Sequence, residues 1–366
     1  MESVLYACRR LWNHFLAQRI ETYRETKKSV SCFDQARGIP SLAVKDACLK
    51  EVYSQVLQDV PRRLDKAFQA FFRRLKQGET PGFPRFKASD RYNSFTYPQF
   101  NGSFKMTEDG KMHLSKIGCI KIAYHREAKG LWKTCTVKRT STGKWYVVIS
   151  VEQESVRKHS GNITAVGMDL GLKEFAVFSD GSRIKRARFF KAEENALAKA
   201  QRKLAKQTKG TLARRKVRKV IARLHERIVG KRNDFTHQAS RRVADTYGVI
   251  CVEDLDINGM KEQKTIVING KERSARGVHR SINDVAWLQF VNQLKYKAEE
   301  AGSSVIMVNP KNTTKTCSIC GKIGAKDLSE RQYVCECGHA EDRDLNASRN
   351  ILRLGLQSLE TLKKAS

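Results

Sequence analysis

A carboxylate in the middle of an apolar strand is the feature that most restricts how this chain can fold. The segment ITAVGMDLGLKEFAVFSDG (163–181) has the pattern of two strands joined by a tight turn, and Asp169 lies inside the first strand. A charge at that position must be paired or bound to a metal, unless the side chain bonds to backbone in a turn. The segment therefore predicts a buried sheet that carries an acid with a specific partner.

The elements after this hairpin predict the layers around the sheet. Helical patterns cover 185–232, 283–301 and 345–363, and short apolar strands cover 248–254 and 303–310. Gly210 is expected to divide the first helical stretch into two helices. The order is strand, strand, helix, strand, helix, strand, helix, which is typical of an α/β layered domain.

The first 153 residues do not alternate strands and helices; helical patterns come first and strand patterns follow. Apolar residues recur at helical spacing over 4–26 and again over 43–77, where Pro61 is expected to kink or divide the helix. The segment 28–42 between them is predicted to be a loop. Over 81–153, short runs alternate apolar and polar residues between glycines, which favours a small antiparallel barrel or sheet. A polar linker then leads to the α/β part.

The charge of the chain narrows the class of partner. Its 366 residues include 70 Lys and Arg against 38 Asp and Glu, a net charge of +32, and such an excess points to a polyanion such as nucleic acid. Residues 185–232 alone contain 18 Lys or Arg and 3 Glu, a net charge of +15. Basic residues occupy every face of the helices predicted over 199–232, which favours phosphate contacts over a solvated charged face.

The sequence has no feature typical of a membrane or secreted protein. Its apolar runs are shorter than the ~18 residues of a membrane span. The N-terminal segment MESVLYACRRLWNHF lacks the pattern of a signal peptide. Ten cysteines are too thinly spread for a disulfide scaffold, so we expect a protein of the reducing cytoplasm.

Four of the cysteines are grouped near the C-terminus. CSIC (317–320) and CEC (335–337) form two short knuckles, each followed directly by a glycine, Gly321 or Gly338. Four thiolates suit a tetrahedral Zn²⁺, and a site with four protein ligands is structural because no position is open for a substrate. The alternatives are free buried cysteines or disulfides. The predicted zinc ligands are Cys317, Cys320, Cys335 and Cys337.

Three acids form a second group. Asp169 lies within its strand, Glu253 ends the strand VICVED, and Asp344 lies where the last helix begins. Together they could hold two Mg²⁺ ions that activate a water and stabilise the leaving oxygen of a phosphodiester. Taken singly, Asp342 and Asp344 could be helix N-caps, and Glu253 could be a solvated acid like its neighbour Asp254.

With these motifs the chain resembles the TnpB (OrfB) family of transposon-encoded RNA-guided endonucleases, which are related to the type V CRISPR effectors. The matching segments cover nearly the whole chain in the family's order, at residues 54–87, 94–99, 167–181, 225–235, 252–260, 308–321 and 335–351. The resemblance implies an RNase H-like RuvC core whose catalytic, magnesium-binding acids are Asp169, Glu253 and Asp344. It also implies that the four cysteines belong to the family's zinc finger.

The resemblance further implies a multidomain fold of the α+β and α/β classes. The expected parts are a helical recognition lobe (1–80), a β-barrel wedge domain (81–155), a RuvC-like nuclease domain in two pieces (156–315 and 340–366) and an inserted zinc finger (316–339). Family members usually carry a strand of the wedge barrel before the first helix. This sequence has only a few residues there, so the barrel is expected to lack a strand, through truncation or a misassigned start.

The implied activity is RNA-guided DNA cleavage beside a short motif, with two Mg²⁺ ions at the acids and one structural Zn²⁺. Its partners would be a guide RNA from the transposon end, the double-stranded target DNA and the displaced single strand, at the nucleoid of a prokaryotic cell. A nuclease-inactive RNA-guided repressor is an alternative, which the presence of all three acids disfavours. A transposase or transposase accessory is another, although no strand-transfer or relaxase motif is visible.

Nine residues are predicted to contact nucleic acid. The resemblance suggests that the target-adjacent motif is read by Lys50, Gln55, Asn93 and Thr96. The alternative that Gln55 and Thr96 are ordinary surface polar residues stays open, because few side chains usually read bases. Phosphate contacts in the basic helices are expected from Arg214, Arg215, Lys216, Arg218 and Lys219.

Overall fold

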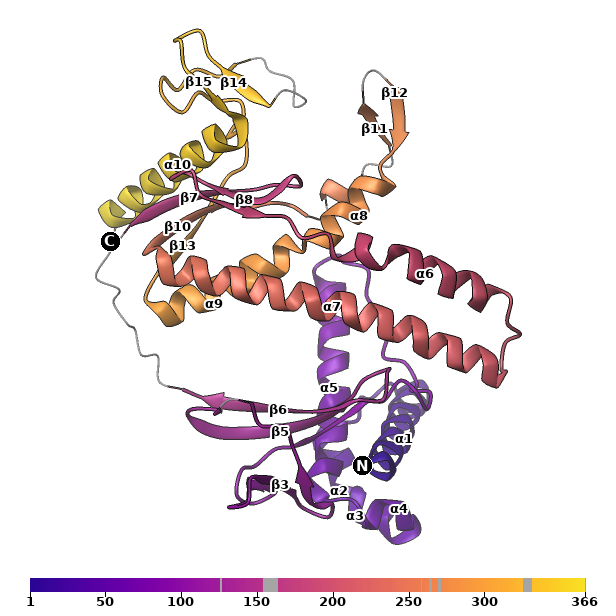
Figure 1. The fold of residues 1–366 in the computed structure, drawn as a ribbon. Coiled ribbons are helices and arrows are strands. Elements are labelled where there is room, and N and C mark those ends of the chain that lie inside the picture. The colour runs from indigo at the N-terminus through magenta and orange to yellow at the C-terminus, as the bar shows by residue number, and fades with distance from the viewer. Residues whose placement is uncertain are drawn as a thin grey trace. The chain divides into compact units, whose positions relative to one another are not determined.

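The computed structural model describes residues 1–125, 127–153, 164–257, 259–262, 265–268, 271–324 and 331–365. The chain divides into two units, Met1–Glu154 and Ser155–Ser366, which Figure 1 colours by residue number. The division falls at the polar linker that the sequence predicts. In the described ranges, no helix has both the length and the apolar character that a membrane span requires.

The first unit begins with helices. They are α1 (Glu2–Thr26), α2 (Cys32–Arg37), α3 (Ile39–Lys45), α4 (Ala47–Lys50) and α5 (Ser54–Lys76). The prediction of a loop over 28–42 is wrong: Ser31 caps α2 by accepting the N–H of Asp34, and Pro40 lies in the first turn of α3, where its missing N–H is not needed. The predicted division at Pro61 is also wrong, because α5 continues through that residue as one helix.

The β part of the first unit forms two three-stranded antiparallel sheets, β1-β5-β6 and β2-β3-β4. The strands are β1 (Ser94–Tyr97), β2 (Phe104–Met106), β3 (Lys111–Leu114), β4 (Gly118–Lys121), β5 (Leu131–Arg139) and β6 (Trp145–Glu152). The antiparallel sheet is confirmed, but the closed barrel is not found among the described strands. A barrel requires a neighbour on both sides of every strand, and β1 and β6 each pair on one side only.

The helices and the sheets of the first unit share one core. Trp12 and Phe15 of α1, Leu64 of α5, and Phe95 and Tyr97 of β1 are buried in the same cluster. The helical and β segments that differ so clearly in sequence pattern therefore pack against each other within a single unit.

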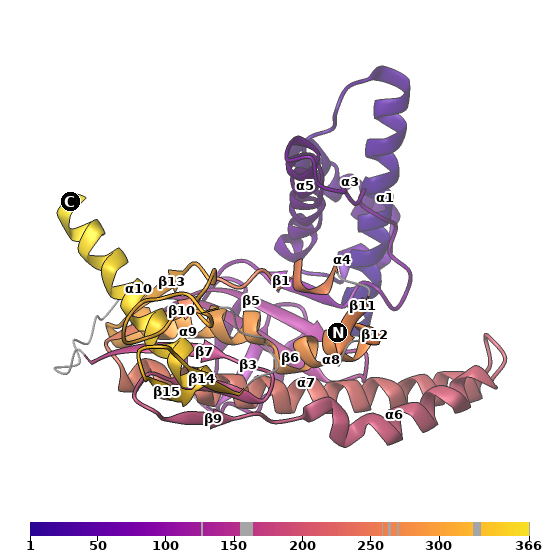
Figure 2. The ribbon, with the colours of Figure 1, turned by 90° about the horizontal axis from the view of Figure 1, so that it is seen from above.

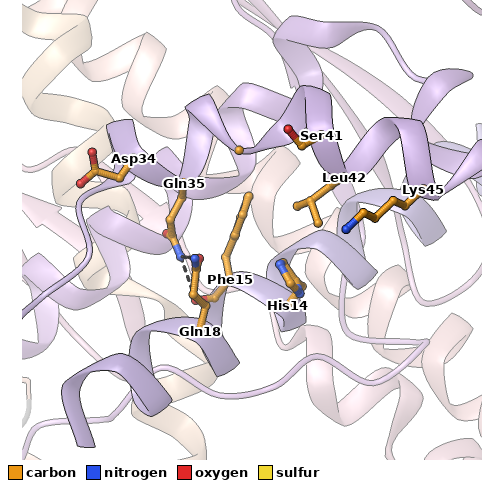
Figure 3. Close-up of a pocket in the computed structure, with 9 residues that line it drawn as sticks. His14, Phe15, Gln18, Asp34, Gln35, Ser41, Leu42 and Lys45 are labelled. Atoms are coloured by element: carbon orange, nitrogen blue, oxygen red, sulfur yellow. Dashed lines mark hydrogen bonds between the residues drawn. The ribbon is translucent and has the colours of Figure 1, made fainter. Parts of the chain in front are cut away.

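A pocket of about 170 Å³ lies between α1 and the short helices α2 and α3, as Figure 3 shows. Buried Gln35 of α2 donates hydrogen bonds through Nε2 to Phe15 O at 2.9 Å and to Gln18 Oε1 at 3.0 Å. One amide thus attaches α2 to α1. A contact of this kind has no periodic signature, which explains why the segment 28–42 resembles a loop in sequence.

The second unit is built on a five-stranded sheet with the order β13-β10-β7-β8-β9. The strands are β7 (Ala165–Leu170), β8 (Glu174–Phe178), β9 (Arg183–Lys185), β10 (Val249–Glu253) and β13 (Ser304–Val308). β7, β10 and β13 run parallel, and β8 and β9 extend the sheet in antiparallel fashion. The predicted order of strands and helices is confirmed, while β9 is an additional strand between the predicted hairpin and the predicted helical stretch, which it overlaps only at Lys185.

Helices cover both faces of this sheet (Figure 1). One face carries α7 (Leu212–Thr246), α8 (Arg276–Val285) and α9 (Trp287–Ala301), and the other carries α10 (Arg343–Ala365). Met168 of β7 is buried with Phe290 of α9, whereas Cys251 of β10 is buried with Ile351 of α10. Alternate residues of each strand thus enter opposite cores.

Helix α6 (Phe189–Ala205) pairs with α7 in a hairpin (Figure 2). The predicted division around Gly210 is confirmed, and Thr211 caps α7 by accepting the N–H of Arg214 at 3.2 Å. Smaller elements are η1 (Gly259–Lys261), β11 (Thr265–Ile268), β12 (Lys271–Ser274), β14 (Gln332–Val334) and β15 (Ala340–Asp342). The last two strands pair into the ribbon that carries the second cysteine knuckle.

Candidate acidic and four-cysteine sites

Two of the three predicted acids lie on adjacent parallel strands. β7 and β10 pair with Cys251 opposite Gly167 and Val252 opposite Met168. One residue further along, Asp169 and Glu253 occupy corresponding positions. Because side chains alternate along a strand, both acids lie on the face that α10 covers.

The third acid comes from α10, which lies directly on β7. A Cβ added at Gly167 would be 2.0 Å from Ser348 O, so only glycine allows the helix to come this close. Asp342 Oδ1 accepts the N–H groups of Asp344 and Leu345 at 3.0 and 3.2 Å. Asp342 is therefore the helix cap, and the carboxylate of Asp344 is available to the acid cluster.

The three carboxylates repel one another. Burial, followed by repulsion from Glu253 and then Asp344, raises the pKa of Asp169 to about 8. Burial also raises the pKa of Glu253, against the effect of a hydrogen bond from Thr313 Oγ1 at 2.5 Å. A cation placed among these groups would relieve the repulsion and favour their ionised forms.

The acids of the cluster differ from adjacent acidic residues in burial and in the charges around them. Glu253 is 8% exposed, whereas the adjacent Asp254 is exposed, so only the former belongs to the cluster. Arg343 Nη2 lies 3.1 Å from Asp344 Oδ1, and Arg331 Nη1 lies 3.6 Å from Asp344 Oδ2. Asp344 thus has two arginines near it, and Arg343 also lowers the pKa of Asp169, but by less than Glu253 and Asp344 raise it.

The four cysteines lie closer to one another than the three acids do. Across the described ranges they are the one set of at least three His, Cys, Asp or Glu whose ligand atoms all lie within 4.8 Å of one another. The sulfur of Cys317 is 3.8 Å from that of Cys337, and Cys320 and Cys335 are 3.5 Å apart. A disulfide of ~2.05 Å is excluded, and the spacing matches the ~3.8 Å between sulfurs on a tetrahedral zinc with bonds of ~2.3 Å.

The ionisation of these thiols suits metal binding. Burial tends to raise the pKa of Cys317, but the backbone N–H groups of Cys320 and Ile319 outweigh it and lower the pKa to about 6. The N–H of Cys337 tends to lower the pKa of Cys335, but burial and hydrogen bonds to the other thiols raise it to about 12. The cluster thus shares protons that a metal ion would displace.

Helix α10 connects the cysteine knuckle to the acids through Asn346, which is fully buried. Its Nδ2 donates to Thr316 O at 2.8 Å, and its Oδ1 accepts the N–H of Ser318 at 2.8 Å. Sequence analysis did not single out Asn346. The available signal is an asparagine on the apolar face of a helix, because a buried amide requires a partner.

Asn350, one turn later, secures the same loop. Its Nδ2 donates to Thr313 O at 2.9 Å and to Thr316 O at 2.7 Å. Thr313 in turn donates its hydroxyl to Glu253. The loop after β13 is therefore a positioning element for one acid, which sequence analysis also missed.

The five basic candidates of α7 differ in their surroundings. Arg215, Lys216, Arg218 and Lys219 are exposed. Arg214 is half-buried and donates through Nη1 to Leu204 O at 2.7 Å and Gln207 O at 2.8 Å, at the end of α6. Arg214 therefore fixes the turn of the α6–α7 hairpin, whereas the other four present their charges to solvent.

Two of the motif-reading candidates lie at the start of α5 and the end of α4. Lys50 is exposed. Gln55 donates through Nε2 to Gln99 Oε1 at 2.7 Å, while its own Oε1 is buried without a partner. Gln55 is thus joined to the segment SFTYPQ, as expected if the two act together.

The other two motif-reading candidates are held inside the first unit. Asn93 donates to Asp90 O at 2.9 Å. The hydroxyl of Thr96 accepts from Arg63 Nη2 at 2.5 Å and is 2.8 Å from that of Thr136. The structure therefore brings Gln55 to the motif segment but gives Thr96 an internal, structural set of contacts.

Comparison with known proteins identifies relatives for most of the chain. A family model described as "Probable transposase" matches residues 148–264, and one described as "Cas12f1-like, TNB domain" matches 287–351. The "Putative RNA-guided DNA endonuclease InsQ" of Escherichia coli K12 is 31% identical over 95% of this chain and 87% of its own length. A protein of Streptomyces pristinaespiralis named in the same way is 30% identical over 97% of this chain and 85% of its own.

A solved structure shares the fold. The protein in the cryo-EM structure of the Cas12f1–sgRNA–target DNA complex aligns over 96% of this chain and 81% of its own, with a TM-score of 0.57 and 17% sequence identity. This similarity supports the arrangement of mixed α and β elements described above.

Proposed function

The chain belongs to the TnpB (OrfB) family of transposon-associated RNA-guided DNA endonucleases, and from this premise we propose that Asp169, Glu253 and Asp344 form its DNA-cutting centre. A guide RNA from the transposon end pairs with the target strand, and the protein recognises a short adjacent motif. The observation that carries the proposal is a buried carboxylate on β7 next to carboxylates from β10 and α10: burial first, and then repulsion from Glu253 and Asp344, raise the pKa of Asp169 to about 8.

The acids fit Mg²⁺, which prefers hard oxygen ligands. Their mutual repulsion is the property expected of carboxylates that share a cation. Bound Mg²⁺ would supply an activated water and stabilise the leaving oxygen of the phosphodiester, giving 5′-phosphate and 3′-hydroxyl ends.

The protein's own part is to hold the acids in place and to release the proton of Asp169. Two adjacent strands fix Asp169 and Glu253, and Thr313 orients the latter by a hydrogen bond. Asp342 caps α10 and thereby positions Asp344. Because one acid cluster serves both DNA strands, the two cuts are sequential.

The cysteine group fits a structural Zn²⁺. Four sulfurs at tetrahedral spacing leave no open position, so the ion would hold the two knuckles together and take no part in cleavage. Through Asn346 it would also stabilise the loop and helix next to the acids.

The distribution of positive charge supports a proposal for where each nucleic acid binds. The exposed basic residues of α6 and α7 follow the backbone of the guide–target duplex and the displaced strand. The first unit recognises the guide and the motif, with Gln55 as the strongest candidate for a base contact.

The test is cleavage by a purified complex of the protein with its guide RNA. Asp169→Ala should abolish cutting in Mg²⁺ and leave guide-dependent DNA binding intact, since a metal ligand is lost and the fold is kept. Asp254→Ala, which removes an exposed acid beside the cluster, should cut normally. Cutting by the Asp169→Ala protein would contradict the assignment, and binding without cutting by the unaltered protein would favour an RNA-guided repressor.

A further inference from the structure

A second basic feature of the second unit lies at the start of α6, apart from the α7 residues proposed above to contact phosphates. A pocket of about 390 Å³ is enclosed by the connection from β9 to α6 and by α8. Figure 1 shows the start of α6 beside α8. Four cations line the pocket, namely Arg186, Arg188, Lys191 and Arg280.

The acids of this pocket are already engaged. Asp284 accepts the N–H of Phe190 at 3.1 Å and forms an ion pair with Arg232 at 3.0 Å. Glu194 forms an ion pair with Arg280 at 2.6 Å. These two carboxylates therefore do not neutralise the remaining cations.

Arg186, Arg188 and Lys191 consequently have no carboxylate partner in the part of the chain that the structure describes. Burial lowers the pKa of Arg186, and Arg188 lowers it further although Asp284 opposes this effect. Arg186 Nε is buried without a hydrogen-bond partner. Uncompensated guanidinium groups in a concave site are the arrangement that binds a phosphate, since an arginine fork matches phosphate oxygens.

The position of Arg186 indicates which phosphate. Its Nη1 donates to Leu172 O at 2.5 Å, in the turn between β7 and β8. That turn follows Asp169 by only a few residues. The pocket is on the α8 side of the sheet and the acids are on the α10 side, so a DNA strand held by the pocket would pass the β7–β8 turn to reach Asp169.

We propose that this pocket binds one backbone phosphate of the DNA strand being cut and so fixes its register at the acids. The inference rests on the proposed nuclease function. Gly277 in the first turn of α8 also lines the pocket, so the positive end of that helix dipole lies at its wall.

The test combines a charge-removing variant with DNA that lacks single charges. Arg188→Gln with Lys191→Gln removes two exposed cations, and Arg242→Gln with Lys295→Gln removes two exposed cations elsewhere in the unit. Neutral methylphosphonate linkages are placed one at a time along each strand around the cut. Cleavage is measured with each guide-loaded protein, and thermal melting confirms that the variants fold.

The unaltered protein should cut about 10- to 100-fold more slowly when one particular linkage is neutral, as expected for a lost charge-assisted contact. The Arg188/Lys191 variant should be slowed to a similar extent on ordinary DNA and be insensitive to that same linkage. The Arg242/Lys295 variant should behave like the unaltered protein.

Three results would overturn the proposal. One is unchanged cutting of ordinary DNA by the Arg188/Lys191 variant. Another is a neutral linkage that slows the unaltered protein and the Arg188/Lys191 variant equally. The third is a loss of guide-RNA affinity with no sensitive DNA linkage, which would assign the pocket to RNA. If the unaltered protein does not cut at all, the nuclease proposal fails, and the affinities of the same proteins for the same DNAs decide whether the pocket binds a phosphate.

Discussion

Asn346 accepts the backbone N–H of Ser318 at 2.8 Å, and this bond joins the helix that carries Asp344 to the first cysteine knuckle. The same side chain donates to Thr316 O at 2.8 Å and is fully buried. The two candidate sites are therefore mechanically connected, because a displacement of the knuckle is transmitted to the first turn of α10.

Asn346→Ala should weaken both sites at once. It leaves the part-buried N–H of Ser318 without its acceptor, at a cost of about 1–3 kcal/mol, and removes one of the two amide donors to Thr316 O. We expect a lower melting temperature, weaker retention of zinc on dialysis against a chelator, and slower cutting. Asn292→Ala, at an exposed position of α9, is the matched control and should change none of these. Unaltered melting and zinc content in Asn346→Ala would show that the connection is not needed.

The raised pKa of Asp169 predicts how stability depends on pH. Its folded pKa of about 8 exceeds the ordinary value of 3.8, so the ionised form destabilises the metal-free fold, increasingly as the pH rises from the lower value to the higher. Asp169→Asn should therefore raise the free energy of unfolding in chelator at pH 8 or above, by roughly 1–3 kcal/mol, and with it the melting temperature. The difference should shrink as the pH falls and disappear below about pH 3, where the Asp169 carboxyl is protonated in the folded and the unfolded state alike.

Metal binding requires Asp169 to lose its proton, so at limiting Mg²⁺ the cutting rate of the unaltered protein should increase with pH up to about 8.

Asp254→Asn is the control for the melting experiment, since that side chain is exposed. A melting difference between Asp169→Asn and the unaltered protein that is constant from pH 4 to pH 9 would show that the group is not coupled to folding.

The purified protein should contain about one zinc per chain by elemental analysis, as a closed four-thiolate site requires. Cys317→Ser should lose the metal and melt at a lower temperature, because three remaining thiolates bind more weakly. Cys119→Ser removes an exposed cysteine outside the cluster and should keep the metal. A metal-free preparation with full activity would rule out the structural zinc.

The exposed residues Arg215, Lys216, Arg218 and Lys219 should contact phosphates. Replacing all four by Gln should flatten the dependence of log affinity on log salt by about 0.7–0.9 per lost contact and slow cutting without changing the target sequence. Arg214 is retained in this variant because it holds the end of α6. Arg214→Ala alone should instead lower the melting temperature. An unchanged salt dependence in the fourfold variant would show that these charges only solubilise the helix.

Gln55→Ala should alter the preferred motif in a depletion assay that presents randomised bases beside the target. Its amide is joined to Gln99 and can reorganise to meet a base edge. Thr96→Ala should act mainly on stability, because Arg63 would lose an acceptor. If a protein that carries both Gln55→Ala and Thr96→Ala selects the same motif as the unaltered protein, other residues read the motif.

Local patterns predicted the elements with the strongest periodicity. The first helix, the hairpin around Asp169, the strand ending in Glu253 and the helix beginning near Asp344 are where the sequence places them, because burial of one face imposes a regular spacing. Segments held by the polar contacts of buried amides were missed. Gln35 joins α2 to α1, and Asn346 and Asn350 hold the loop after β13.

The sequence by itself determined the chemical groups of this protein: one acid inside an apolar strand and two at element ends, four cysteines in two knuckles, and an excess of positive charge concentrated in one helical stretch. Only the tertiary structure decided which of these groups act together. Strand register and the close approach of α10 at Gly167 bring Asp169, Glu253 and Asp344 onto one face, whereas Asp342 and Asp254 serve as a cap and a solvated neighbour. The reason is physical: charge repulsion, desolvation and hydrogen bonding depend on distances between residues far apart in the chain, which no local pattern specifies.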